Sequence, residues 1–105
     1  MAEGSKAVDF GYLETFASGD TNLVREVLKV FSEEAHVWAK DLATGPQEWR
    51  AIVHTMKGTG RAVGAGPLGD LCEKAELEGP HLLPQIAAEL DEVIAEVDAW
   101  LAVNG

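Results

Sequence analysis

Cysteine is nearly absent from this chain, since Cys72 is the only one in 105 residues. A single cysteine excludes an intramolecular disulfide and a zinc site built from several cysteines, and it fits a reducing compartment. Long apolar runs are missing too, because no segment approaches the roughly 18 apolar residues that a membrane span needs. Residues 1–10 also lack the apolar core of a signal peptide. We therefore expect a cytoplasmic protein with no membrane partner.

Basic residues are scarce as well, with 8 Lys and Arg against 18 Asp and Glu and a formal charge of −10. Nucleic acids and anionic membranes are bound by Lys and Arg that neutralise phosphates, so this charge argues against both as partners. Three of the basic residues nevertheless cluster around His54, namely Arg50, Lys57 and Arg61. A local positive patch in an acidic chain favours a small anion, with phosphate as the first candidate.

Glycine and proline divide the chain into segments with apolar residues every three or four positions, a pattern typical of amphipathic helices. No segment shows the alternation of a half-buried strand. The expected helices cover about residues 9–17, 21–44, 46–64, 67–78 and 82–102. Four such helices joined by short turns predict an all-α fold, an antiparallel up-down-up-down four-helix bundle with a short N-terminal cap helix. We expect residues 1–8 to be disordered and residues 9–105 to form a single helical domain, which should be a monomer.

His54 lies on the side of its helix that is turned away from the core. At about 100° per residue, Lys57, Gly58 and Arg61 project within about 60° of it. The large apolar residues project to the opposite side: Trp49, Ile52, Met56 and Val63. This histidine is therefore available as a nucleophile, with a lysine one turn away that can hold an anion.

Gly58 follows His54 by one helical turn and leaves no side chain beside the imidazole. A glycine inside a helix costs roughly 1 kcal/mol relative to alanine. Such a cost on an exposed face indicates close approach by another surface. Gly60 projects toward the core side, where helix packing is the simpler explanation.

These residues resemble the signature of the histidine-containing phosphotransfer (HPt) domain, a His-x-x-Lys-Gly segment with a further glycine six residues on. His54, Lys57, Gly58 and Gly64 fit that pattern. Further residues stand where such domains carry similar ones: Phe31, Trp49, Leu68, Leu71, Cys72 and Glu76. The resemblance covers nearly the whole chain.

The resemblance implies a phosphorelay intermediate. His54 would accept a phosphoryl group from the aspartyl phosphate of a receiver domain in a hybrid histidine kinase. It would then pass the group to the aspartate of a response regulator's receiver. We expect the exposed Nε2 to be the attacking atom, Lys57 to neutralise charge on the phosphoryl group, and Gly58 to admit the partner.

We also expect Arg50, Thr55 and Arg61, which lie near His54 along the same helix, to contact the partner. The receiver would bring a divalent metal, so we expect no cofactor and no metal site in this chain. A Walker-type phosphate loop is missing, and the chain has no room for an ATP-binding domain. We therefore expect a phosphocarrier, not an enzyme with its own kinase activity.

Two other functions compete with this interpretation. Four-helix bundles also host carboxylate-bridged metal centres built on Glu-x-x-His pairs, and Glu33 with His36 has that spacing. The second such pair, Glu78 with His81, spans Gly79-Pro80 and cannot lie on one continuous helix. We therefore expect His36 and His81 to be solvated. The other possibility is a helical adaptor that binds a receiver or kinase without phosphotransfer.

Overall fold

The structure is a computed structural model that describes residues 7–45 and 47–104. All the regular elements within these residues are helices, which confirms the predicted all-α class. They are α1 (Phe10–Phe16), α2 (Thr21–Ala43), α3 (Trp49–Ala62), α4 (Gly66–Glu78), the 3-10 helix η1 (Pro80–Leu82) and α5 (Leu83–Asn104).

Capping residues explain where the helices begin and end. The Asp9 carboxylate accepts from the Tyr12 backbone N–H at the start of α1, and Asp20 accepts from Leu23 at the start of α2. An aspartate in this position satisfies a backbone donor that has no partner within the helix. At the C-terminal end of α4, the residue that follows the helix is Gly79, which has a positive φ of 126°. These local signals are why the expected boundaries lie close to the observed ones.

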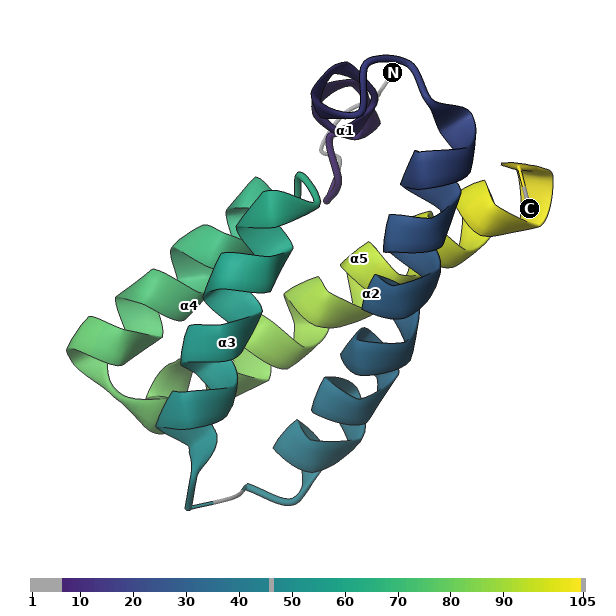
Figure 1. Ribbon diagram of the computed structural model, residues 1–105. Coiled ribbons are helices and arrows are strands. Elements are labelled where there is room, and N and C mark those ends of the chain that lie inside the picture. Colours follow the sequence, from purple (N-terminus) through teal and green to yellow (C-terminus); the bar gives the residue numbers. More distant parts are fainter. Residues whose placement is uncertain (1–6, 46, 105) are drawn as a thin grey trace, which may run out of the picture.

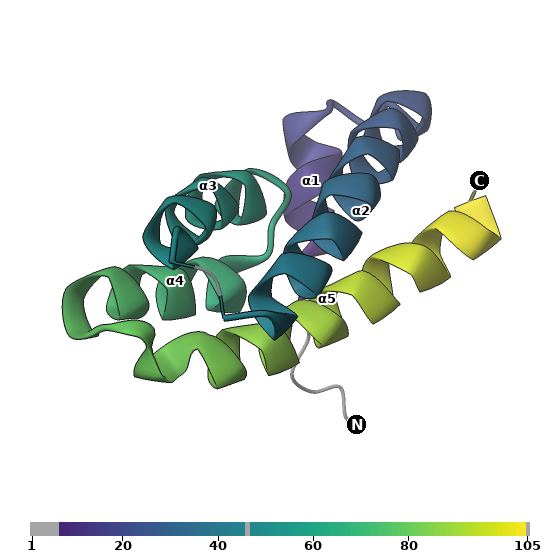
Figure 2. The same cartoon turned by 90° about the horizontal axis from the view of Figure 1, so that it is seen from below.

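The chain alternates direction from one long helix to the next. In Figure 1 it runs down α2, up α3, down α4 and up α5, while α1 lies across the upper end beside α2. Seen from below in Figure 2, α3 lies over α4 and α2 lies over α5. These two helix pairs share the most extensive packing in the molecule. The site on α3 is therefore carried mainly by α4.

One core of apolar side chains runs through the four long helices. Each helix contributes fully buried residues, with Leu28 and Phe31 from α2, Val53 and Met56 from α3, Leu68 and Cys72 from α4, and Ile86, Leu90, Val93 and Val97 from α5. None of the buried residues in the described ranges is polar or charged. No helix in those ranges is both long enough and apolar enough to cross a membrane.

The segment before α1 packs against the bundle. Ala7 and Val8 are buried, and their backbone N–H groups each donate to a carboxylate oxygen of Glu96 on α5 at 2.9 Å. The next backbone N–H, of Asp9, donates to the Gly64 carbonyl at 2.9 Å. We expected residues 1–8 to be disordered, but Ala7 and Val8 belong to the helical unit. Residues 1–6 lie outside the described residues.

Candidate functional site

His54 projects into solvent from the middle of α3, with 69% of its side chain exposed. The residues that α3 buries are on its other side, namely Val53, Met56 and Gly60. The expectation that His54 faces away from the core is therefore confirmed. Its Nδ1 lies 2.8 Å from Oε2 of Glu76, which is on α4.

Glu76 also binds Lys57, whose Nζ lies 2.6 Å from its other oxygen, Oε1. The side chains of Glu76 and Lys57 are only 18% and 23% exposed. Hydrogen bonds from Lys57 and then from His54 lower the pKa of Glu76, so it is a carboxylate at neutral pH. The His54 imidazole and the Lys57 ammonium group of α3 thus both contact one carboxylate of α4.

This contact determines which nitrogen of His54 carries a proton. An ionised carboxylate can only accept a hydrogen bond, so Nδ1 must donate one. In the neutral ring the lone pair then resides on Nε2. Nε2 has no hydrogen-bond partner among the described residues. The imidazole therefore presents an unprotonated nitrogen to solvent.

The basic residues on either side of His54 also bind α4. Arg50 donates to the Glu76 carbonyl at 2.6 Å, and Arg61 donates to Asp70 at 3.0 Å and to Glu73 at 2.6 Å. Hydrogen bonds to Glu73 and then Asp70 raise the pKa of Arg61. The sequence favours a positive patch around His54, but the structure places the acidic residues of α4 beside it, so this face carries charges of both signs.

Two small residues beside His54 are open to solvent. Thr55 and Gly58 are both exposed, and a Cβ atom added at Gly58 would have nothing within 4 Å apart from its chain neighbours and the backbone of its own helix. Gly69 on α4 differs, because an added Cβ would lie 2.5 Å from Cγ of Arg61. Gly69 therefore makes room for Arg61 where α3 packs against α4. No packing within the chain requires a glycine at position 58.

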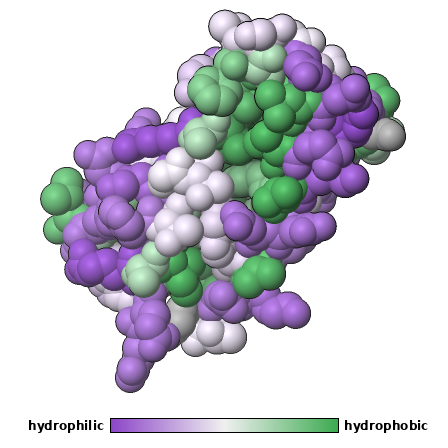
Figure 3. Space-filling view, viewed as in Figure 1, coloured by the Kyte–Doolittle hydropathy of each residue, from purple (hydrophilic) through white to green (hydrophobic). Residues whose placement is uncertain are grey.

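An apolar groove of about 430 Å³ runs between α2 and the C-terminal half of α3. It is lined by Glu26, Val27, Val30, Phe31, Glu34, Thr59, Ala62 and Val63. Figure 3 shows apolar surface over this region, where α1, α2 and the end of α3 meet, while hydrophilic surface covers the α4 side. The groove begins directly after Gly58, so a partner approaching that glycine would also meet it.

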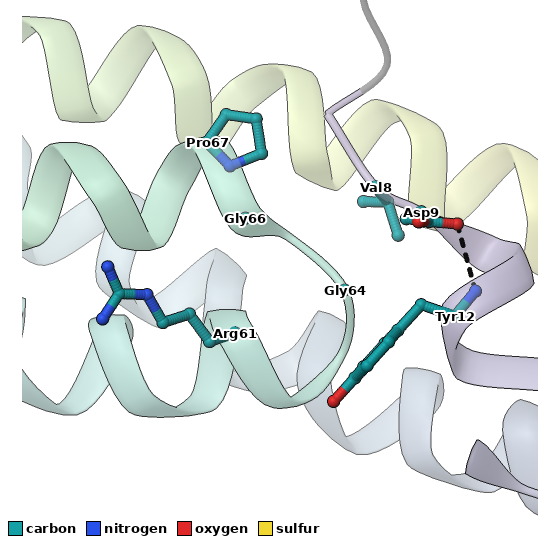
Figure 4. Close-up of a pocket in the computed structure, with 7 residues that line it drawn as sticks. All are labelled: Val8, Asp9, Tyr12, Arg61, Gly64, Gly66 and Pro67. Carbon is teal, nitrogen blue, oxygen red and sulfur yellow. Dashed lines mark hydrogen bonds between the residues drawn. The ribbon is translucent and has the colours of Figure 1, made fainter. Parts of the chain in front are cut away.

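A second hollow, of about 560 Å³, lies between α1 and the turn that joins α3 to α4. Figure 4 shows its lining, with Tyr12 along one wall, Gly64 and Gly66 in the turn, and the Arg61 guanidinium directed away from Tyr12. Neither His54 nor Lys57 lines it. It is separate from the imidazole of His54.

The residue pairs of the metal-centre alternative lie apart from this site. His36 has its Nε2 3.1 Å from Asp98 on α5, and His81 has its Nε2 3.7 Å from Glu78. Both histidine side chains are well exposed. Within the described ranges, no group of three or more His, Cys, Asp and Glu side chains could hold a metal ion.

The site is thus an exposed histidine on a helical bundle, in contact with a carboxylate and flanked by a lysine and a glycine. The model of the Hpt domain family matches residues 26–100, and the chain belongs to this family. The crystal structure of the histidine phosphotransferase ShpA from Caulobacter crescentus is similar, with a TM-score of 0.81 and 42% sequence identity. The similarity covers 90% of this chain and 89% of that chain. No match was found among the curated proteins.

Proposed function

We propose that this protein accepts a phosphoryl group on Nε2 of His54 from a receiver-domain aspartyl phosphate and passes it to the aspartate of another receiver. The observation that carries the proposal is the contact between His54 Nδ1 and Glu76, which leaves the lone pair on an exposed Nε2. Membership of the Hpt family supports the same role. The protein is then a phosphocarrier in a two-component phosphorelay, and we place it in the cytoplasm as a monomer.

The chemistry requires a positioned nucleophile and neutralisation of charge on the transferred group. The lone pair of Nε2 attacks phosphorus, the bond from phosphorus to the aspartate oxygen breaks, and its electron pair leaves with the aspartate. Lys57 lies one turn from His54 and supplies positive charge by turning from Glu76 toward the phosphoryl oxygens. The receiver brings its own divalent metal.

The receiver docks over Gly58 and the groove between α2 and α3. Transfer requires the receiver's aspartyl phosphate to reach the His54 ring, so the two surfaces must approach closely, and Gly58 offers open space for this. Apolar side chains of the groove, such as Val27 and Val30, give the contact an apolar centre. Arg50, Thr55 and Arg61 lie at its polar edge.

The test is His54→Gln, which removes the nucleophile from an exposed position and should leave the helical circular-dichroism signal intact. Incubation with a panel of phosphorylated receivers should give acid-labile label on the wild-type protein and none on the variant. His36→Gln is the matched control, because His36 is an exposed histidine that also contacts a carboxylate, and it should retain full labelling. Label on the His54 variant would sink the assignment, and receiver binding without label on the wild type would favour the adaptor.

A further inference from the structure

We infer that Arg61 is a positioning residue that holds α4 against α3 over Gly69, and that it acts on transfer from within the protein and not by binding the receiver. The inference rests on the proposed function and narrows it, because Arg61 is one of the residues at the polar edge of the proposed docking surface. Its side chain contacts α4 at three residues, namely Gly69, Asp70 and Glu73.

The aliphatic stem of Arg61 lies against Gly69, which is a buried residue of α4. A Cβ atom at position 69 would lie 2.5 Å from Cγ of Arg61 and 2.7 Å from its Nε, which is closer than Cβ atoms pack in proteins. Gly69 does not have a positive φ, so its backbone would accept alanine. The arginine stem therefore fills the space that the missing side chain leaves, and it covers the backbone of α4.

The guanidinium group of Arg61 is held by two carboxylates of α4. Its Nη2 donates to Asp70 at 3.0 Å and to Glu73 at 2.6 Å. Figure 4 shows the group directed away from Tyr12 and the hollow beside it. Exposed ion pairs contribute little when each stands alone, but here the packed stem fixes the group that makes both. To bind a carboxylate of a partner, Arg61 would first have to give up both of these contacts.

These contacts lie one helical turn from the ion pair beside His54. Arg61 follows Lys57 by one turn on α3, and Glu73 precedes Glu76 by one turn on α4. Lys57 and Glu76 are themselves 2.6 Å apart. Both ion pairs join the same two helices, so losing the one at Arg61 lets α4 shift beside the site. Such a shift would misplace Lys57 relative to the phosphoryl group and slow transfer without weakening receiver binding.

The first measurement is a double-mutant cycle of stability, from the denaturation midpoints of Arg61→Ala, Gly69→Ala and the double variant. Alanine is a better helix former than glycine, but at position 69 it displaces the arginine stem. Gly69→Ala should therefore leave the wild type no more stable, whereas it should stabilise the Arg61→Ala variant. An equal gain in both backgrounds would overturn the inference. Gly66→Ala is the control, because an added Cβ there meets nothing within 4 Å, and it should act equally in both backgrounds.

The second measurement is single-turnover transfer from a phosphorylated receiver that labels the wild-type protein, followed over a titration of that receiver. Arg61→Ala should lower the maximal rate about threefold to tenfold, a fraction of the roughly 100-fold that a 1 Å misplacement can cost, and leave the half-saturation concentration unchanged. Gly69→Ala should lower the maximal rate in the same way, although residue 69 is buried and cannot touch a receiver. Lys74→Ala, which removes an equal charge from an exposed position of α4, should transfer at the wild-type rate.

Two results of the titration would contradict the inference. A raised half-saturation concentration with an unchanged maximal rate in Arg61→Ala would assign this residue to receiver binding. Wild-type transfer by Gly69→Ala would show that displacing the arginine stem does not disturb the site. Both results would leave His54 as the acceptor, whereas label that persists on His54→Gln would refute the proposed function itself.

Discussion

The imidazole of His54 and the ammonium group of Lys57 lie on one helix, yet both bind a carboxylate supplied by the next helix. A single acidic side chain therefore holds the two residues of α3 that the proposed transfer would use, the proposed nucleophile and the cation for the phosphoryl group. In the proposed transfer Lys57 would exchange Glu76 for phosphate, and an incoming dianion would compete well because it offers more charge than the carboxylate. At the scale of the residue, Glu76 is therefore the shared partner of His54 and Lys57, and its contact with Lys57 is the one that phosphate would replace.

Gly58 yields a prediction at the same scale. Gly58→Ala should raise the free energy of unfolding by up to about 1 kcal/mol, because alanine is the better helix former and an added Cβ meets no other part of the structure. Gly58→Gln should remain folded but transfer phosphate at least about tenfold more slowly, since its side chain obstructs the receiver, a loss of about 1.4 kcal/mol in the barrier. Thermal unfolding and single-turnover transfer measure the two effects.

Ala95→Gln is the matched control for Gly58→Gln, because it adds a glutamine at an exposed position of α5, away from α3. It should transfer at the wild-type rate. Wild-type transfer by Gly58→Gln would mean that no partner surface approaches this glycine closely.

At the scale of the elements, α3 is attached to two neighbouring segments at its C-terminal end. Arg61 binds Asp70 and Glu73 across the interface with α4, and beyond it the turn at Gly64 contacts the segment before α1. Gly64 has a φ of 90°, and an added Cβ would lie 2.7 Å from the Asp9 carbonyl oxygen. Neither the backbone conformation nor the space admits a side chain there.

Gly64→Ala should therefore lower the free energy of unfolding by about 1–3 kcal/mol, the range for a strained backbone conformation. Gly66→Ala provides a control two residues away, because an added Cβ there meets nothing within 4 Å and its φ is not positive. Chemical denaturation of both variants measures the difference. Equal stability of the two would show that the contact between Gly64 and Asp9 contributes nothing to the fold.

At the scale of the whole molecule, the excess of acidic residues acts on stability. Partial burial, followed by the charges of Glu92 and Glu96, raises the pKa of Glu89 above its ordinary value of 4.5. The folded protein then binds this proton more tightly than the unfolded chain does. The contribution of Glu89 to stability falls as pH rises from the ordinary pKa through the raised one, and it stays lower at neutral pH.

Glu89→Gln should therefore raise the melting temperature at pH 7 and lose this advantage when the pH falls below the ordinary carboxyl range. Asp91→Asn is the control, because it removes one negative charge from an exposed position of the same helix. Thermal unfolding followed from pH 3 to pH 8 checks the prediction. A larger gain from Asp91→Asn would indicate that net charge, and not the burial of Glu89, limits stability.

The sequence by itself determined what depends on neighbours along the chain. The period of apolar residues and the positions of glycine and proline predicted the helices, because helix formation and termination are local. The same period predicted that His54 is exposed, since one helix turns its whole buried face toward one core. The all-α class was predicted for the same reason, and the chemical roles of His54, Lys57 and Gly58 remain predictions.

Only the tertiary structure decided which residues meet across helices. Glu76 lies 22 positions from His54, and its contact depends on the register of α4 against α3, which is set by packing along their whole interface. The pairing of Arg61 with Asp70 and Glu73, and the burial of Ala7 and Val8 beside Glu96, depend on the same assembly. Helical periodicity predicts which way a side chain projects, but which side chain it meets is decided when the helices pack.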